Sequence, residues 1–137
     1  MPFSIIEATF KRVYELSGLN RVTFCWHSGE PLIPGLEFYR KAIEVCEKLN
    51  PGTVQVRHSI QTNGTLITDE WARFFKAHEF VVGVSVDGPS HIHDEQRVDR
   101  HGKASLDRTL RGIEILRRYN VSGGALCVIT RNEPVPF

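Results

Sequence analysis

Residues 24–35 read FCWHSGEPLIPG, an apolar run that stops at a turn carrying His27, Ser28, Gly29 and Glu30. The apolar run is typical of a β-strand, and the Gly and Pro residues mark where it ends. The polar groups crowded on this turn have two interpretations. Either the strand simply ends here, or its end is part of a binding surface, and the other strand ends decide between them.

Helices and strands alternate along the chain. The predicted helices cover 4–17, 36–49, 69–78 and 105–119, and the predicted strands cover 22–27, 54–61, 80–86 and 125–130. Ser4 and Glu7 predict a capping box, Thr68 precedes the third helix, and residues 87–104 are predicted to form a polar loop. Strict alternation implies an α/β fold with parallel strands covered by helices, because parallel neighbours need a crossover connection.

The carboxyl ends of the predicted strands all carry polar groups. In parallel α/β folds, open or closed into a barrel, ligands bind at these ends. Four such ends together indicate a site. The four segments are Trp26–Glu30, Gln61–Gly64, Ser85–Gly88 and Thr130–Asn132.

Several of these side chains suit a polar ligand. The Glu30 carboxylate could pair with a ligand ammonium while the Gly29 carbonyl accepts a second hydrogen bond, or it could be an exposed turn carboxylate. Residues Gln61–Gly64 are either a site or only a turn, because Asn-Gly is a common turn dipeptide. Ser85 and Asp87 are two apart in an apolar run, so they face the same way and need buried partners.

The loop after the third strand offers further candidates. His91 and His93 form an H-x-H pair, which is known as a metal-ligand pair in hydrolases, but no further ligand is positioned convincingly, and we expect no metal site here. A hydrolase using Glu30, Asp87 and these histidines remains a distant alternative. Arg97 could bind a carboxylate through two hydrogen bonds or could be solvated.

The composition bounds the class of protein. The 137 residues form one domain or part of one, and the formal charge of +1 gives no basic excess of the kind that nucleic acid requires. No apolar run is long enough to cross a membrane, and no signal peptide is evident, so we expect a cytoplasmic protein. Cys25, Cys46 and Cys127 fit no disulfide or metal spacing, and each is expected to be a small buried hydrophobe.

Four spaced motifs carry a family resemblance. They are CWHSGEPLIPG (25–35), SIQTNGTLITDEW (59–71), VGVSVDGPSHIHDEQR (82–97) and VITRN (128–132). In this order and spacing the chain resembles the radical SAM enzymes of the sulfatase-maturating and SPASM-domain peptide maturase group. The resemblance covers about residues 5–132 and implies a partial (β/α) barrel.

The resemblance also implies roles for single residues. Ser28, Gly29 and Glu30 match the motif that holds the methionyl amino group of S-adenosylmethionine. Ser85 and Arg97 match a pair that contacts the cofactor, chiefly its ribose and its carboxylate. An arginine fork facing a carboxylate suits that role.

Four further positions follow from the same match. Gln61 and Asn63 match a turn lining the same pocket, and Asp87 matches the acidic residue of the S-x-D-G turn. His27 occupies a position that faces the substrate peptide in relatives. Ser28 departs from the family, which usually has Gly there, and serine restricts φ more than glycine does.

The family's catalytic chemistry depends on a 4Fe-4S cluster held by a C-x-x-x-C-x-x-C run. These 137 residues contain no such run, and their three cysteines are too widely spaced to replace it. We therefore expect residues 1–137 to be a partial radical SAM core domain, a fragment of an enzyme that modifies a peptide or protein through a 5′-deoxyadenosyl radical. Alone, it is expected to be inactive and marginally stable. The alternative is a non-catalytic binding module that keeps the pocket.

Overall fold

Four parallel strands form one sheet in the order β1-β2-β3-β4 in the computed structural model, which describes residues 2–129. The strands are β1 (Arg21–Trp26), β2 (Gln55–Thr62), β3 (Val81–Ser85) and β4 (Gly123–Leu126). The helices are α1 (Phe3–Tyr14), α2 (Leu36–Leu49), α3 (Asp69–Ala77), α4 (Ser90–Gln96) and α5 (Leu106–Arg118). The expected α/β fold with four parallel strands is confirmed.

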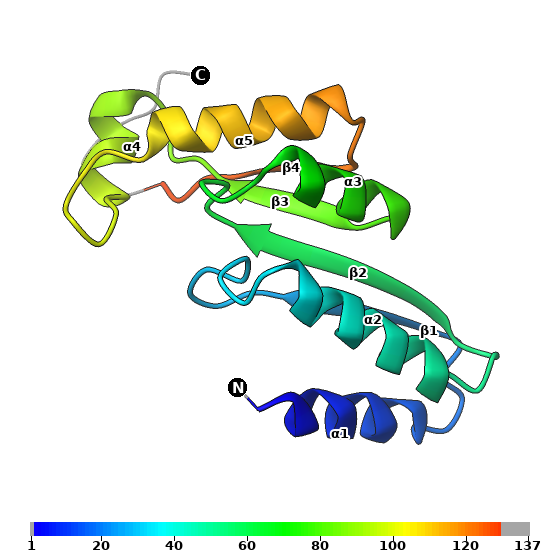
Figure 1. Cartoon of the computed structure of the whole chain (residues 1–137). Helices are drawn as coiled ribbons and strands as arrows, with labels where there is room; N and C mark the ends of the chain where they lie inside the picture. Colours follow the sequence, from blue (N-terminus) through cyan, green and yellow to red (C-terminus); the bar gives the residue numbers. More distant parts are fainter. Residues whose placement is uncertain (1, 130–137) are drawn as a thin grey trace.

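Helices α1, α2, α3 and α5 cover one face of the sheet (Figure 1). In β2, side chains alternate between buried and more exposed positions, so that His58, Ile60 and Thr62 face the helices. The cross-strand neighbours Cys25 and Ser59 lie on the opposite, more exposed face. One face of the sheet therefore builds the core, and the other remains accessible.

The core is unusually aromatic. Tyr39 from α2 makes edge-to-face contacts with Trp26 at 5.2 Å and Trp71 at 5.5 Å between ring centroids. His58 stacks on Phe80 at 5.2 Å. Such pairs add about 0.5–1.5 kcal/mol each beyond the area that they bury. They fix α2 and α3 against the sheet and so fix the loops that leave the strand ends.

Of two predicted helix starts, one is wrong in its cap and the other is confirmed. Helix α1 begins at Phe3 and its N-cap residue is Pro2, without a side-chain cap, so the predicted capping box of Ser4 and Glu7 does not form. Glu7 instead pairs with Lys11 one turn later, at 2.9 Å. By contrast, the Thr68 hydroxyl caps α3 by accepting a hydrogen bond from the backbone N–H of Trp71, at 3.3 Å.

The predicted loop 87–104 contains a helix, α4. Pro89 precedes this helix and lacks an N–H, which suits the position before a helix. Asp94 then reaches α5, where its Oδ1 accepts hydrogen bonds from the backbone N–H groups of Ser105 and Leu106, at 2.8 and 2.9 Å. The bond from Leu106 first and the bond from Ser105 next hold the pKa of Asp94 below its usual value.

The cysteine prediction holds for one residue of three. Cys46 is buried in α2 beneath α1, where its thiol meets the Tyr14 hydroxyl at 3.1 Å. Cys25 and Cys127 are exposed. Cys25 alternates onto the face that no helix covers, and Cys127 follows β4, whose residues are all exposed. Their apolar sequence neighbours therefore do not bury them.

In residues 2–129, no helix is long and apolar enough to cross a membrane.

Candidate functional site

The carboxyl ends of the strands lie along one edge of the sheet, where α4 also sits (Figure 1). Side chains there link the ends to one another. The Glu30 carboxylate accepts hydrogen bonds from the Thr62 hydroxyl at 2.7 Å and from the Asn63 N–H at 2.9 Å. It also accepts one from the Leu32 N–H at 3.0 Å. Glu30 is thus not the exposed turn carboxylate of the simpler interpretation, because it joins the β1 and β2 ends.

The turn after β2 is fixed from the helix side as well. The Thr109 hydroxyl in α5 donates to the Asn63 carbonyl at 2.9 Å. Gly112, one turn later, packs so closely that a Cβ there would lie 2.2 Å from the Gly64 carbonyl oxygen. Asn63 Oδ1 accepts from Thr65, leaving the amide N–H₂ of Asn63 without a partner among the described residues. Residues Gln61–Gly64 therefore form a turn that hydrogen bonds hold in place at the end of β2, as the turn interpretation of this segment predicts.

Gln61 and Ser85 meet across β2 and β3. The Gln61 amide donates to the Ser85 hydroxyl at 3.0 Å, and Ser85 is 8% exposed. The Gln61 side chain lies over Gly83, because a Cβ on Gly83 would meet Gln61 Oε1 at 2.0 Å. Gly83 thus provides the space that lets Gln61 reach Ser85.

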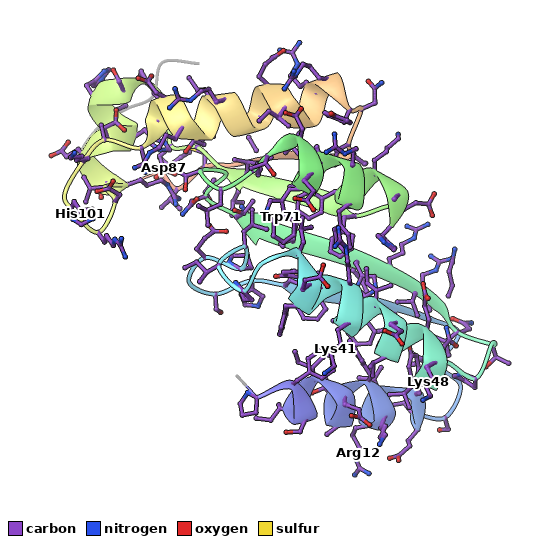
Figure 2. The ribbon with its side chains drawn as sticks, viewed as in Figure 1. Arg12, Lys41, Lys48, Trp71, Asp87 and His101 are labelled. Carbon is purple, nitrogen blue, oxygen red and sulfur yellow. The ribbon has the colours of Figure 1, made fainter. Side chains whose placement is uncertain are left out.

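Asp87 is the next polar centre, just beyond β3 and beside α4 (Figure 2). Asp87 is 4% exposed. Its carboxylate accepts hydrogen bonds from Arg97 Nε at 2.5 Å and from Arg97 Nη2 at 3.1 Å. Its Oδ1 also accepts from the Val128 N–H at 3.0 Å. Burial raises the pKa of Asp87, but the bonds from Arg97 and Val128 outweigh burial and leave the pKa below its usual value.

The requirement that Ser85 and Asp87 have buried partners is confirmed. Of the two sequence interpretations of Arg97, the one with two hydrogen bonds to a carboxylate holds, and that carboxylate is Asp87. Arg97 retains Nη1, which has no partner among the described residues.

The geometry of His93 does not suit the H-x-H metal interpretation. His93 is completely buried, and both its ring nitrogens are hydrogen bonded within the protein, to the Asp87 N–H at 3.3 Å and the Ser105 hydroxyl at 3.1 Å. His91 lies two residues away on the exposed surface of α4. Residues 2–129 contain no group of three or more His, Cys, Asp or Glu residues that could hold a metal ion.

The turn after β1 has a strained backbone. Ser28 has φ +84° and Gly29 has φ +58°, so two successive residues lie in the left-handed region that favours glycine. The Ser28 hydroxyl lies 3.2 Å from His27 Nδ1. Strain of this kind costs about 1–3 kcal/mol and persists where the surroundings fix it. Here, the Tyr39 hydroxyl donates to the Pro31 carbonyl at 2.7 Å, and the Glu30 bonds hold the other side.

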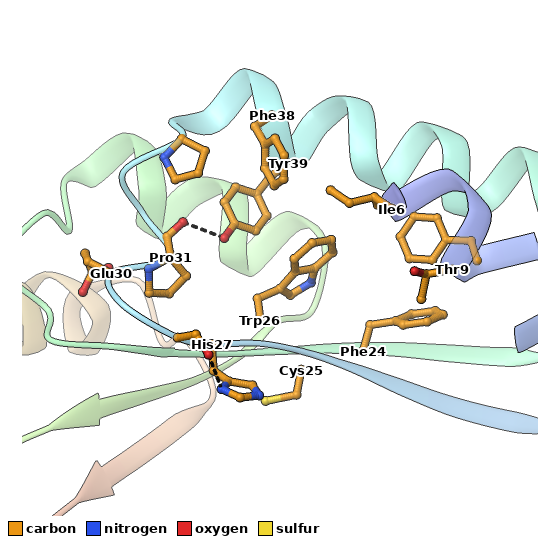
Figure 3. A pocket seen from close by; sticks show the side chains of 13 residues that line it. Ile6, Thr9, Phe24, Cys25, Trp26, His27, Glu30, Pro31, Phe38 and Tyr39 are labelled. Atoms are coloured by element: carbon orange, nitrogen blue, oxygen red, sulfur yellow. Dashed lines mark hydrogen bonds between the residues drawn. The ribbon is translucent and has the colours of Figure 1, made fainter. Parts of the chain in front are cut away.

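A cavity of about 730 Å³ opens beside this turn, between α1 and β1 (Figure 3). Its wall is mainly aromatic and aliphatic, with polar side chains at the turn and at Thr9 in α1. Among the expected site residues, His27, Ser28 and Glu30 line it, whereas Gln61, Ser85, Asp87 and Arg97 do not. The candidate site is thus the sheet edge, and the cavity is a separate apolar space that shares the turn.

Sequence reasoning assigned no supporting role to three residues that hold the site together: Thr62, Thr109 and His93. Each supplies a buried hydrogen bond to a site residue rather than an exposed functional group. The sequence did draw attention to His93, because it forms an H-x-H pair with His91 in a segment of mixed charge. For Thr109, nothing in an amphipathic helix distinguishes it from a solvated residue.

Comparison with known proteins identifies relatives along the whole chain. The family model of the Radical SAM superfamily matches residues 4–134. A cysteine-type anaerobic sulfatase-maturating enzyme from Clostridium novyi is 40% identical over 132 residues, which are 96% of this chain and 35% of the enzyme. A serine-type anaerobic sulfatase-maturating enzyme from Bacteroides thetaiotaomicron is 44% identical, over 94% of this chain and 31% of the enzyme.

Solved structures of a related enzyme have the same fold as this chain. The chain superimposes on "Native anSMEcpe with bound AdoMet" with a TM-score of 0.87 and 36% identity, over 93% of this chain and 34% of the other. It superimposes on "Native anSMEcpe with bound AdoMet and Cp18Cys peptide" with a TM-score of 0.86 and 36% identity, over 93% and 35% of the two chains. The described fold is thus that of a radical SAM partial barrel, and the chain spans about a third of the length of these relatives.

Proposed function

Because this chain belongs to the radical SAM superfamily, we propose that it forms the S-adenosylmethionine-facing strand ends of a radical enzyme that modifies a peptide or protein. The observation that carries the proposal is the linked polar edge, in which Glu30, Gln61, Ser85 and Asp87 join four strand ends through side-chain hydrogen bonds. Residues 1–137 would then be part of the core domain of that enzyme.

The chemistry of the donor set fits S-adenosylmethionine. The backbone carbonyls of Ser28 and Gly29 are suited to accept from the methionyl ammonium. Glu30 has one of its roughly four acceptor sites left after its three hydrogen bonds. Arg97 donates to Asp87 through Nε and Nη2, which leaves Nη1 to bond the methionyl carboxylate of the ligand. The solved structure described above has bound AdoMet, which supports S-adenosylmethionine as the ligand.

The ribose and the substrate would meet the remaining residues. The Ser85 hydroxyl and the Gln61 amide oxygen suit ribose hydroxyls, and the free amide of Asn63 suits a carbonyl or a ring nitrogen. His27 follows β1 on the exposed side of the turn, where a peptide could reach it. In this family the bound cofactor supplies a 5′-deoxyadenosyl radical that removes a hydrogen atom from the substrate.

The iron–sulfur cluster does not fit the residues of this chain. Cys46 is buried beneath α1 and bonded to Tyr14, whereas Cys25 is exposed on the opposite face of the sheet. The described residues therefore bring no three thiols together. The ligands of a cluster would have to come from outside this chain.

The test begins with the DNA on both sides of this reading frame. We expect a C-x-x-x-C-x-x-C run upstream, in frame or one frameshift away. The complete protein, reconstituted without oxygen, should release 5′-deoxyadenosine from S-adenosylmethionine. Ser85→Ala should reduce that release at least about 10-fold, whereas Ser59→Ala, on the same face of the neighbouring strand, should not. A genuine start before Met1 and a stop after Phe137, with no cysteine run nearby, would instead support the binding module.

A further inference from the structure

His93 contacts both partners of the Asp87–Arg97 ion pair without touching the side chain of either. Its Nδ1 accepts from the Asp87 N–H at 3.3 Å, and its backbone carbonyl accepts from the Arg97 N–H at 2.8 Å. Its Nε2 lies 3.1 Å from the Ser105 hydroxyl, which donates to the Arg97 carbonyl at 2.5 Å. The ring is completely buried.

These bonds determine where the ring proton lies. Nδ1 faces a backbone N–H and must accept, so it carries no proton. The Ser105 hydroxyl gives its only proton to the Arg97 carbonyl, so it accepts from Nε2–H. His93 is therefore the neutral tautomer protonated at Nε2, and a closed circuit runs from Asp87 through His93 and Ser105 to Arg97. The Arg97 guanidinium completes the circuit at the Asp87 carboxylate.

The circuit explains how a long side chain is held at the edge of the sheet. Arg97 follows α4 directly, and the next residue, Val98, pairs only through an isolated bridge to Ala104. A free arginine would lose side-chain rotamer entropy on binding an anion, and one already ordered loses less. His93 fixes the backbone at both Asp87 and Arg97. The Asp87 and Arg97 side chains can then form their two hydrogen bonds, and Arg97 Nη1 remains available to a ligand.

We propose that His93 is a positioning residue for the cofactor edge, ordering the Arg97 guanidinium before the ligand arrives. The inference rests on the proposed function for the identity of the ligand, S-adenosylmethionine. Its structural part, the ordering of Arg97, does not depend on any ligand. The two parts are therefore measured separately.

The first measurement is nuclear magnetic resonance of the 137-residue chain with ¹⁵N-labelled histidine and arginine. We expect a His93 ring with a bare Nδ1 and a protonated Nε2, and an Arg97 Nε–H signal protected from exchange with water. In His93→Leu that protection should fall at least about 10-fold. The exposed Gln96→Leu, on the same helix, should leave it unchanged. A proton on His93 Nδ1 would overturn the proposal. So would an Arg97 Nε–H that is equally protected from exchange in His93→Leu and in the wild type.

Two partial variants keep the test decisive if His93→Leu does not fold. His93→Asn keeps an acceptor near the Asp87 N–H, and His93→Gln keeps a donor near Ser105. We expect each to restore part of the Arg97 protection, and Ser105→Ala to lose a similar part. If both partial variants behave like the wild type, the circuit does not order Arg97 and the proposal fails.

The second measurement is the dissociation constant of S-adenosylmethionine, from a titration of the same proteins. His93→Leu should weaken binding about 10-fold, the effect of one lost hydrogen bond to a charged group. Unchanged affinity in a variant whose Arg97 signal is unprotected would overturn the positioning role while leaving the proposed function intact. Absence of binding by the wild type would overturn the proposed function, and the role of His93 at that ligand with it.

Discussion

The Glu30 carboxylate accepts a hydrogen bond from the Thr62 hydroxyl at 2.7 Å, joining the ends of two neighbouring parallel strands. The same carboxylate accepts from the Asn63 N–H. One acidic residue thus sets the separation of the two turns that we assign to the cofactor.

Glu30→Gln should destabilise the chain. The glutamine carboxamide has an N–H₂ group in place of one carboxylate oxygen. At least one of the groups that donate a hydrogen bond to Glu30 therefore loses its acceptor. We expect a loss of about 1–3 kcal/mol in the free energy of unfolding, measured in urea. Glu44→Gln, on the exposed side of α2, is the matched control and should change stability by less than about 0.5 kcal/mol. Equal effects of the two substitutions would contradict the bridging role of Glu30.

Ser28→Gly should stabilise the chain by about 0.5–1 kcal/mol. Ser28 has φ +84°, where glycine is unstrained, and relief of strain exceeds the entropy that glycine adds to the unfolded state. Ser59→Gly, in the extended backbone of β2, should do the opposite. Thermal unfolding of the two variants beside the wild type measures both. A destabilised Ser28→Gly protein would mean that the Ser28 hydroxyl, near His27, contributes more than the strain costs.

Gly83→Ala and Gly124→Ala form a matched pair, because the two glycines are neighbours in register on the open face of the sheet. A Cβ at Gly83 would displace Gln61 from Ser85, whereas nothing lies within 4 Å of a Cβ at Gly124. We expect Gly83→Ala to weaken S-adenosylmethionine binding about 10-fold with a small change in stability, since the displaced group is the flexible end of a side chain. Gly124→Ala should leave the Gln61–Ser85 bond unchanged, as the Gln61 amide resonances would report.

Gly112→Ala should destabilise the chain although it removes a glycine from a helix. Alanine is normally better by about 1 kcal/mol inside a helix. Here its Cβ would lie 2.2 Å from the Gly64 carbonyl oxygen, and separating α5 from the turn costs about 1–3 kcal/mol. Arg111→Ala, the exposed neighbour, should be almost neutral. A more stable Gly112→Ala protein in urea unfolding would show that α5 does not contact the turn closely.

The stability of the chain should fall as the pH drops below neutrality. Burial lowers the pKa of His58 to about 4 from an unfolded value of 6.5. The neutral form is favoured in the folded state, so this stability is fully present above pH 6.5. It is lost as the pH falls toward 4, by about 3 kcal/mol in total. Unfolding in urea at pH 7, 5.5 and 4.5 measures the loss.

His58→Leu should flatten that pH dependence. It should also lower stability at pH 7, because the Trp26 indole N–H loses its acceptor. A His58→Leu protein that keeps the full slope between pH 7 and 4.5 would assign the pH dependence to other groups.

The architecture could be predicted from the sequence because alternating helices and apolar strands have few arrangements. The strand ends could also be predicted, since Gly29, Gly64 and Gly88 interrupt apolar runs at the same edge. The hydrogen-bond partners of the polar residues could not be predicted in this way. Whether Arg97 faces a ligand or Asp87 depends on where α4 places it, and α4 itself was predicted as loop because 87–104 is rich in charge.

The exposure of Cys25 illustrates the same limit. Its neighbours Phe24 and Trp26 are apolar, yet strand alternation turns Cys25 onto the face opposite to theirs (Figure 3). Local composition reports how apolar a segment is, and only the packing of the helices decides which of its faces is covered. Thr130–Asn132, expected at the fourth strand end, lie outside the described residues.

The most direct test of the central claim is a titration of the ¹⁵N-labelled 137-residue chain with S-adenosylmethionine, followed amide by amide. The account predicts that the shifts gather at the strand ends, in residues 28–30, 61–63 and 85–87, together with Arg97. Shifts confined to Phe10 and Phe38 would place the ligand in the cavity between α1 and β1. That result, or no shift at millimolar ligand, would contradict the assignment of the sheet edge as the cofactor site.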